Sequence, residues 1–392
     1  MGRTGKLLGK IMAVGALLLL AAFVWKREEV ARLNAVLTLF DEDRIVENFS
    51  HMDRLFLTTE MATEDQSVSA LPYGPQWALP VDVSEWIARR HVTGLVVLSG
   101  GALVHESYYL GTGEADRRIS WSVAKSMLSA LTGILLDKGL LPSIDVAVTD
   151  HVPQLVGSAY EGTTLRNVLQ MSSGVAFNED YGAFWSDINK MGRVIALGGS
   201  MNGFAAGLDT RLRPPGTQMQ YVSIDTHVAA MVLEGVTGRR LQDLMADYLV
   251  GPMGFESTPY YITDGEGTAF ALGGLNMTTR DYARFGQMMA NGGIWRGEQL
   301  VPSNWVRDST LPSAPTRGED PGYGLQWWIP RGWPEGEFLA QGVYGQYIYV
   351  NRTLGVVVAV NSADTRFEDR GVDAENEAIL RSIAARVAAM AL

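Results

Sequence analysis

A serine and a lysine stand three residues apart, Ser122 and Lys125, at the start of a long apolar segment. Residues 122–141 are rich in helix formers, and Gly139 is placed to end a helix, so we predict a buried helix here. Side chains three residues apart share one helix face, which brings the lysine amine to the serine hydroxyl. A neutral lysine can accept the serine proton, and N–H groups at a helix N-terminus can stabilise an oxyanion. The pair therefore predicts nucleophilic catalysis by serine.

The composition favours a chemical role for this lysine. Of six lysines in the chain, Lys125 is the one that interrupts an otherwise apolar helix face. A charge in such a position is costly unless it is used. Because the Ser-x-x-Lys pattern is short, a solvated surface lysine remains the alternative interpretation at this point.

Composition also excludes several functional classes. With 392 residues and 47% hydrophobic side chains, the chain can build a sizeable core in one large domain or two. The net charge of −11 and the absence of a basic run argue against a nucleic-acid partner. There is no cysteine, so thiol catalysis, disulfides and thiolate metal sites are excluded. The five histidines have no metal-ligand spacing, and we expect neither a metal nor an organic cofactor.

The N-terminus resembles a targeting segment. Basic residues precede an apolar run over residues 11–25, and Lys26 and Arg27 close it. The run is short for a spanning helix, which needs about 20 residues, and no small-x-small cleavage site precedes Lys26. We predict that residues 1–28 are an uncleaved signal-anchor in a bacterial inner membrane, with the catalytic domain in the periplasm or outside. A cleaved signal peptide and secretion remain the alternative, and a buried core helix is a weaker one.

The rest of the chain predicts an α+β architecture. Residues 29–80 are expected to form a connector and residues 81–392 the catalytic domain. A β-hairpin is expected over 92–110, with Gly100 and Gly101 at its turn. Further strands are expected at 337–340, 346–350 and 355–361, and a C-terminal helix at 373–391. Strands from both ends of the domain would form one antiparallel sheet, with a mostly helical subdomain inserted between them.

The middle of the chain supplies three more candidate site residues, and a histidine that could act as the base of an alternative mechanism. Tyr221 stands at a loop-to-helix junction, followed by Ser223 and His227. Taken alone, Tyr221 and Tyr181 are most simply packed aromatic residues. Asp187 is most simply a solvated loop charge, and His227 a core histidine.

Three motifs in order resemble a known family. They are Ser122-x-x-Lys125, Tyr221-Val-Ser223 and Gly342-Val-Tyr-Gly-Gln346. This order is similar to that of the penicillin-recognising serine hydrolases: class C β-lactamases, D-alanyl-D-alanine peptidases and family VIII esterases. Residues 169–181, 273–286 and 342–347 most resemble the 6-aminohexanoate-dimer hydrolases. The likeness runs from about Val81 to the C-terminus and implies a β-lactamase/transpeptidase-like fold.

The resemblance implies roles by position. Ser122 would be the acylated nucleophile, and Lys125 and Tyr221 would share its proton and return one to the leaving group. Backbone N–H groups of Ser122 and Gln346 would form the oxyanion hole. The residues implied or suggested to contact substrate are Tyr181, which in the dimer hydrolases hydrogen-bonds the substrate amide, Asn276, Tyr344 and Asp187, the last as a partner for a substrate amine.

Two departures from the family pattern bear on the substrate. Val343-Tyr344-Gly345 stands where β-lactamases have Lys-Thr-Gly, and Ser223 stands where they usually have asparagine. Loss of the cation predicts weak binding of a penicillin carboxylate. We therefore expect a serine hydrolase that cleaves small carboxylic esters or linear amides through an acyl-enzyme.

Three alternatives remain open. One is a β-lactamase or D-alanyl-D-alanine peptidase. Another is a catalytically silent, membrane-tethered binding module. A Ser-His-Asp hydrolase using His227 ranks low because the chain has no Gly-x-Ser-x-Gly elbow.

Overall fold

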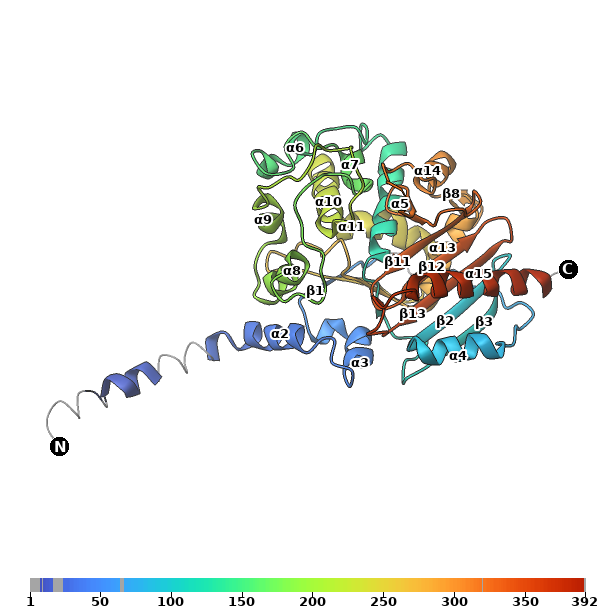
Figure 1. Ribbon diagram of the computed structural model, residues 1–392, viewed down its shortest axis with the longest axis horizontal. Helices are drawn as coiled ribbons and strands as arrows, with labels where there is room; N and C mark the ends of the chain where they lie inside the picture. Colours follow the sequence, from blue (N-terminus) through green and yellow to red (C-terminus); the bar gives the residue numbers. More distant parts are fainter. Residues whose placement is uncertain (1–7, 9, 17–23, 64–66, 319, 391–392) are drawn as a thin grey trace.

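A seven-stranded antiparallel sheet forms the centre of the molecule (Figure 1). The structure is a computed structural model and describes residues 8, 10–16, 24–63, 67–318 and 320–390. The strand order is β3-β2-β13-β12-β11-β10-β9. The bounds are β2 Val92–Ser99, β3 Ala102–Tyr108, β9 Gly322–Tyr323, β10 Trp328–Ile329, β11 Glu337–Gly342, β12 Gln346–Asn351 and β13 Val356–Ser362. The predicted hairpin, the three late strands and their union in one sheet are confirmed.

Strands β2 and β13 are apolar on both faces because both faces of the sheet are covered. Val96 and Leu98 belong to one hydrophobic cluster, whereas Leu95 and Val97 belong to the other. This alternation is the period of two that a strand imposes on its side chains. A continuous apolar run at the centre of a sheet therefore indicates helices on both sides.

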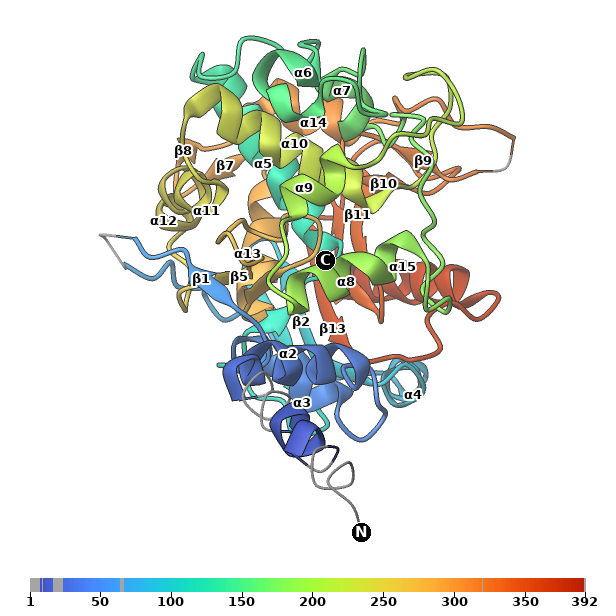
Figure 2. The ribbon, with the colours of Figure 1, turned by 90° about the vertical axis from the view of Figure 1, so that its left-hand side faces the viewer.

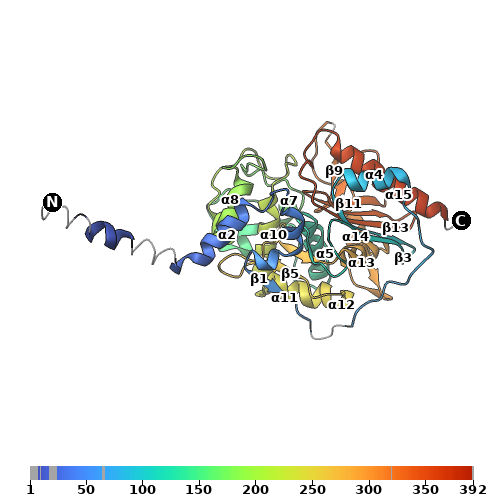
Figure 3. The same ribbon diagram turned by 90° about the horizontal axis from the view of Figure 1, so that it is seen from below.

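Helices cover both faces of the sheet (Figure 3). Helices α4 (Val81–Arg89) and α15 (Val372–Met390) lie on one face and are joined by a 2.8 Å hydrogen bond from Trp86 Nε1 to Asn376 Oδ1. Helices α5 (Val123–Asp137) and α13 (Thr279–Ala290) lie on the other. Helix α15 confirms the predicted C-terminal helix, and α5 is the predicted helix behind Ser122.

A mostly helical region, inserted in the sequence between α5 and α13, packs beside the sheet (Figure 2). Its elements are α6 Val148–His151, η2 Pro153–Leu155, α7 Leu165–Leu169, α8 Asp187–Ala196, α9 Met201–Ala206, α10 Ser223–Thr237, α11 Leu241–Met245, the π-helix Ala246–Val250 and α12 Gly251–Met253, with α14 Ser303–Ser309 following α13. Close packing holds α5 against α14, since a Cβ at Gly133 would lie 2.3 Å from the ring of Trp305. The α+β architecture with a helical insertion is confirmed.

A second, smaller sheet leads into the head of α5. Its order is β1-β5-β6-β4, with β1 Thr58–Glu60, β4 Arg118–Ile119, β5 Tyr260–Ile262 and β6 Leu275–Met277. A separate pair is formed by β7 Ile294–Trp295 and β8 Glu298–Gln299. Because β4 ends three residues before Ser122, this sheet fixes the approach to the predicted nucleophile.

The segment expected to be a connector is folded onto the rest of the protein. It contains α2 (Arg27–Leu37), α3 (Ile45–Ser50), a 3-10 turn at Met52–Arg54, and β1, which pairs with β5. Leu39, Ile45, Phe49 and Met52 are buried in the main core. The sequence shows apolar residues at helical spacing here, but not the surface they cover, which is built from residues far along the chain.

Within the residues that the structure describes, no helix is long and apolar enough to cross a membrane. Residues 1–7, 9 and 17–23 of the predicted signal-anchor lie outside the described residues. The anchor therefore remains a prediction.

Candidate active site

Ser122 caps the N-terminus of α5 and is held by a sharp turn from β4. Trp121, just before it, has φ of +43°, a left-handed conformation that is unusual for a bulky residue. The Ser120 N–H donates to the carbonyl of Leu275 at 2.7 Å, which ties the turn to β6. The strained turn presents the serine at the edge between the small sheet and the helix.

Lys125 is buried one turn further along α5, with 1% of its surface exposed. Its Nζ atom donates hydrogen bonds to the Leu272 carbonyl at 2.8 Å and to Ser223 Oγ at 3.3 Å. None of the ion pairs in the described part of the chain includes Lys125. Burial lowers the pKa of this amine from 10.5 to about 7, against the opposing charges of Glu179 and Asp225. A neutral, proton-accepting lysine is thus accessible near neutral pH.

Tyr221 lies beside both groups. The Lys125 Nζ atom is 5.4 Å from the centroid of the Tyr221 ring, and the tyrosine hydroxyl has hydrogen-bonding contacts with Ser122 and Ser223. The ring also stacks on Trp328 at a centroid distance of 5.4 Å. Burial raises the pKa of the Tyr221 phenol far above its ordinary value, so the hydroxyl keeps its proton. The three residues predicted from the motifs are therefore brought together.

The β11–β12 turn lies against the backbone of Ser122. Gly342 pairs with Gln346 across this turn. A Cβ atom built on Gly342 would lie 3.1 Å from the Ser122 backbone nitrogen and 3.2 Å from the Gln346 Cβ. Only a glycine lets the strand approach this closely. The two residues predicted to form the oxyanion hole are thus neighbours across Gly342.

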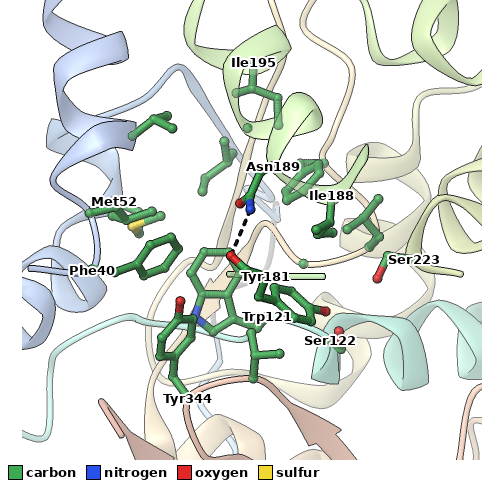
Figure 4. A pocket seen from close by; sticks show the side chains of 18 of the residues that line it. Phe40, Met52, Trp121, Ser122, Tyr181, Ile188, Asn189, Ile195, Ser223 and Tyr344 are labelled. Atoms are coloured by element: carbon green, nitrogen blue, oxygen red, sulfur yellow. Dashed lines mark hydrogen bonds between the residues drawn. The ribbon is translucent and has the colours of Figure 1, made fainter. Parts of the chain in front are cut away.

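Two cavities meet at Ser122. The first has a volume of about 110 Å³ and an apolar lining: Val36, Leu39, Phe40, Met52, Phe56, Trp121, Ser122, Tyr181, Ile188, Asn189, Gly192, Ile195, Ser223, Ile262, Phe270, Leu272, Gly273, Val343 and Tyr344 (Figure 4). The second, about 240 Å³, is lined by Ser122, Tyr181, Tyr221, Trp328, Gln341, Gly342, Val343, Gly345, Tyr347, Phe367, Glu368 and Asp373. We call them the apolar cavity and the acidic cleft. Ser122, Tyr181 and Val343 belong to both, so the predicted nucleophile stands at their junction.

Tyr181 is fixed by two polar contacts. Its hydroxyl donates to Glu179 Oε1 at 2.9 Å, and its carbonyl accepts from Asn189 Nδ2 at 2.9 Å (Figure 4). Burial and the Glu179 charge raise the pKa of the Tyr181 phenol well above its ordinary value. The structure thus places Tyr181 at the boundary of the two cavities, and its predicted hydrogen bond to a substrate amide stays a prediction.

Glu179 is a site residue that the sequence analysis missed. It accepts hydrogen bonds from the Ser223 backbone N–H at 3.0 Å and from the Ser223 hydroxyl. Since Ser223 Oγ also accepts from Lys125, Glu179 is linked to the lysine through one hydroxyl. Its position two residues before Tyr181, inside a stretch shared with the dimer hydrolases, was the available signal.

Tyr344 lines the apolar cavity within an aromatic cluster. Its ring stacks on Phe40 at 4.7 Å and packs near Phe49 and Trp121. Its φ of +61° places it at the tip of the β11–β12 turn. Phe40 and Trp121 were also missed, because their roles depend on the folding of the N-terminal segment.

Asp187 and Asn276 are absent from the described lining of both cavities. Asp187 begins α8, where its carboxylate accepts from the Asn178 N–H at 2.9 Å and pairs with Lys190 at 2.9 Å. Asn276 is buried on β6 and donates to the Gly274 carbonyl at 2.9 Å. Asp187 thus lies outside the described lining of both cavities, and its role toward a substrate amine stays a prediction.

His227 is buried on α10, where Nε2 bonds Asn202 Oδ1 at 2.9 Å. Desolvation lowers its pKa to about 4. This histidine lines neither cavity, so the geometry gives no support to a Ser-His-Asp arrangement. Within the described residues, no cluster of three or more histidine, aspartate or glutamate side chains is arranged to hold a metal ion.

Comparison with known proteins agrees with this geometry. The β-lactamase family profile matches residues 87–381, so the chain belongs to the β-lactamase family and is a serine hydrolase with that fold. It is 30% identical over 341 residues to the 6-aminohexanoate-dimer hydrolase of Paenarthrobacter ureafaciens, covering 81% of this chain and 86% of that protein.

Solved structures show the same fold. A Bacillus anthracis protein provisionally assigned as a 6-aminohexanoate-dimer hydrolase superposes with a TM-score of 0.77 at 22% identity, covering 89% of this chain and 96% of the other. The hydrolase EstCE1, described as having promiscuous acyltransferase activity, superposes with a TM-score of 0.60 at 15% identity, covering 74% and 94%. The predicted fold, family and enzyme class are confirmed.

Proposed function

We propose that the protein hydrolyses small neutral carboxylic esters and linear amides through an acyl-enzyme on Ser122. The observation that carries this proposal is the convergence of Ser122, Lys125 and Tyr221. Tyr221 contacts both the Ser122 hydroxyl and the Lys125 amine, Ser122 stands where the two cavities meet, and the lysine pKa is lowered to about 7. A base with a pKa near the working pH is best suited to accept and return a proton.

The proposed reaction has two balanced steps. Ser122 Oγ attacks the substrate carbonyl while its proton passes to Lys125, directly or through Tyr221. The tetrahedral oxyanion is held by the backbone N–H groups of Ser122 and Gln346. The C–O or C–N bond then breaks, and the proton passes through Tyr221 to the leaving alcohol or amine. Water attacks the acyl-enzyme by the same proton path and releases the acid.

The charges of the acidic cleft support a substrate without a carboxylate near the scissile bond. Glu368 and Asp373 line this cleft, and its described lining contains no lysine or arginine. Burial raises the pKa of both carboxyl groups. A penicillin or peptidoglycan carboxylate would enter such a cleft without a cation to pair with, which is expensive. This supports an esterase or amidase over a β-lactamase or D-alanyl peptidase.

Efficient cleavage of a 6-aminohexanoate dimer, the activity named for the Paenarthrobacter relative, would require a partner for the substrate ammonium. Asp187 is engaged with Lys190, and the described lining of the apolar cavity has no charged side chain. We therefore expect weak turnover of this dimer. Comparing a linear aminohexanoate dimer with a simple ester tests this, and equal efficiency would contradict it.

The alternative that is not an enzyme is a catalytically silent module that binds a ligand without turning it over. Retention of both a buried Lys125 and Tyr221 argues for catalysis, since a buried amine without a function only destabilises the fold.

The test is hydrolysis of p-nitrophenyl butanoate by the parent, Ser122→Ala and Lys125→Ala. Ser129→Ala on the same helix and Lys138→Ala at its C-cap are matched controls outside the described lining of both cavities. We expect both site variants to fall to background and both controls to keep the parent rate. An inactive parent, or full activity in Ser122→Ala, would overturn the proposal.

We also propose that residues 1–28 anchor the protein in a bacterial inner membrane with the catalytic domain on the outer side. The basic head and the apolar run over residues 11–25 support this. Alkaline carbonate extraction of membranes is the test. Retention in the membrane pellet is expected, whereas release of the intact chain would contradict the anchor, and a shortened soluble chain would indicate a cleaved signal.

A further inference from the structure

We infer that the apolar cavity binds the acyl group of the substrate, and that the folded N-terminal segment sets which acyl groups fit. This inference rests on the proposed acyl-enzyme chemistry. It predicts that the acyl part of the substrate is an uncharged, apolar chain. It also gives residues 36–56, expected from the sequence to be a connector, a role in specificity.

The position of Tyr221 decides which part of the substrate enters which cavity. Tyr221 lines the acidic cleft but is absent from the described lining of the apolar cavity. The leaving group must lie beside the proton donor, so it occupies the acidic cleft. Ser122 lies on the boundary, and the acyl group attached to it therefore extends to the other side. That side is the apolar cavity.

The lining of the apolar cavity fits an alkyl chain. No charged residue is among its described lining residues, and its volume of about 110 Å³ is several times that needed for one water. Each methylene moved from water into such a site should raise kcat/KM about fourfold. The gain should stop when the cavity is full.

Two walls from distant parts of the chain form this cavity. Residues Val36, Leu39, Phe40, Met52 and Phe56 come from the N-terminal segment. The facing wall comes from α8, including Ile188 and Ile195 (Figure 4).

The N-terminal wall is held against α8 and the β11–β12 turn. Arg32 Nε donates to the Ala196 carbonyl at 3.0 Å. Phe40 stacks on Tyr344 at 4.7 Å, with the rings 12° from parallel. The wall is thus fixed to the same turn that carries Gln346.

Gly192 is the position that keeps the cavity open. It lies inside α8, where glycine is less favourable than alanine, and it lines the cavity. A Cβ atom there would meet Val36 Cγ1 at 3.7 Å, which is ordinary contact. A larger side chain would extend into the space between α8 and the N-terminal segment. The Gly192→Leu substitution should therefore fill part of the apolar cavity, and it also improves the helix propensity of α8.

The experiment uses the full chain and p-nitrophenyl esters from acetate to decanoate. For the parent, kcat/KM should rise with chain length and then level off. In Gly192→Leu, the ratio of kcat/KM for hexanoate to that for acetate should fall by at least about tenfold, because a leucine displaces about two methylenes of substrate. Lys190→Leu, which adds the same side chain to the exposed side of α8, should keep the parent ratio.

Phe56→Ala provides a second variant that enlarges the cavity instead of filling it. Its optimum should move to a longer chain. An unchanged chain-length profile in both Gly192→Leu and Phe56→Ala overturns the inference while leaving the proposed function intact. Absence of any Ser122-dependent hydrolysis in the parent overturns the proposed function itself.

Discussion

The Lys125 amine lies over the ring of Tyr221, with Nζ 5.4 Å from the ring centroid, and burial moves the pKa values of the two groups apart. The lysine pKa falls to about 7, whereas the tyrosine pKa rises far above its ordinary value. At neutral pH the tyrosine is therefore protonated and a large share of the lysine is neutral. This is the combination that a base and a relay acid require.

The pH dependence of kcat/KM follows from the lysine. Its neutral form is the base, so activity should rise with pH and reach a plateau above about 7. One pH unit below that value, the rate should be roughly tenfold lower than the plateau. A pH profile with a neutral ester substrate measures this. A flat profile between pH 5 and 9 would show that no group with this pKa controls the reaction.

The burial of Lys125 should also make the stability of the folded protein depend on pH. The folded-state pKa of Lys125 is below its ordinary value of 10.5. Below pH 7 the buried amine is protonated, and its whole destabilising contribution is present. As pH rises from about 7 to 10.5, the unfolded chain holds the extra proton and stability increases. Lys125→Met should therefore raise Tm at pH 6, and this advantage should shrink toward pH 10. A lower Tm at pH 6, measured by calorimetry, would contradict the assignment.

Glu179 should act as a positioning residue for the lysine. Its charge raises the Lys125 pKa, and its carboxylate holds Ser223. Glu179→Gln should lower kcat and move the acid limb of the pH profile to lower pH. Asp180→Asn, on the same loop, should leave the acid limb in place. If Glu179→Gln lowers kcat without moving the limb, the residue supports structure alone.

The part of the N-terminal segment that follows residue 26 should be needed for folding and activity. Leu39, Ile45, Phe49 and Met52 are buried, and each such side chain contributes about 1.5–3 kcal/mol relative to exposure. Removing residues 1–26 should preserve Tm and ester hydrolysis. Removing residues 1–57 should lower Tm sharply or prevent folding. Equal Tm values for the two fragments would contradict this.

Much of the central architecture was predictable because its signals are local. The Gly100-Gly101 hairpin and the late Val-rich strand carry their own turn and burial patterns, and β2, β3 and β13 formed as expected. The head of α5 was predictable for the same reason. Ser122, Lys125 and Tyr221 came from motifs, and the structure places Tyr221 beside each of the other two.

What the sequence could not show depends on packing between distant segments. Phe40 is 81 residues from Trp121 in numbering, yet the two rings pack 5.9 Å apart. Asp187 was chosen as a candidate for its charge, but its carboxylate forms an ion pair with Lys190, one helical turn later. Glu179 has no motif of its own, and its importance becomes visible only when Ser223 is placed beside it.

The most direct test of the proposed chemistry is the site of acylation. Tyr221→Phe, which removes the relay hydroxyl, should slow release of the acyl group and let the acyl-enzyme accumulate. We would quench this variant after mixing with p-nitrophenyl butanoate and map the modified peptide by mass spectrometry. One butanoyl group on Ser122 is the expected result, with none in Ser122→Ala. Acylation of another residue, or unmodified Ser122 during continuing turnover, would contradict the mechanism.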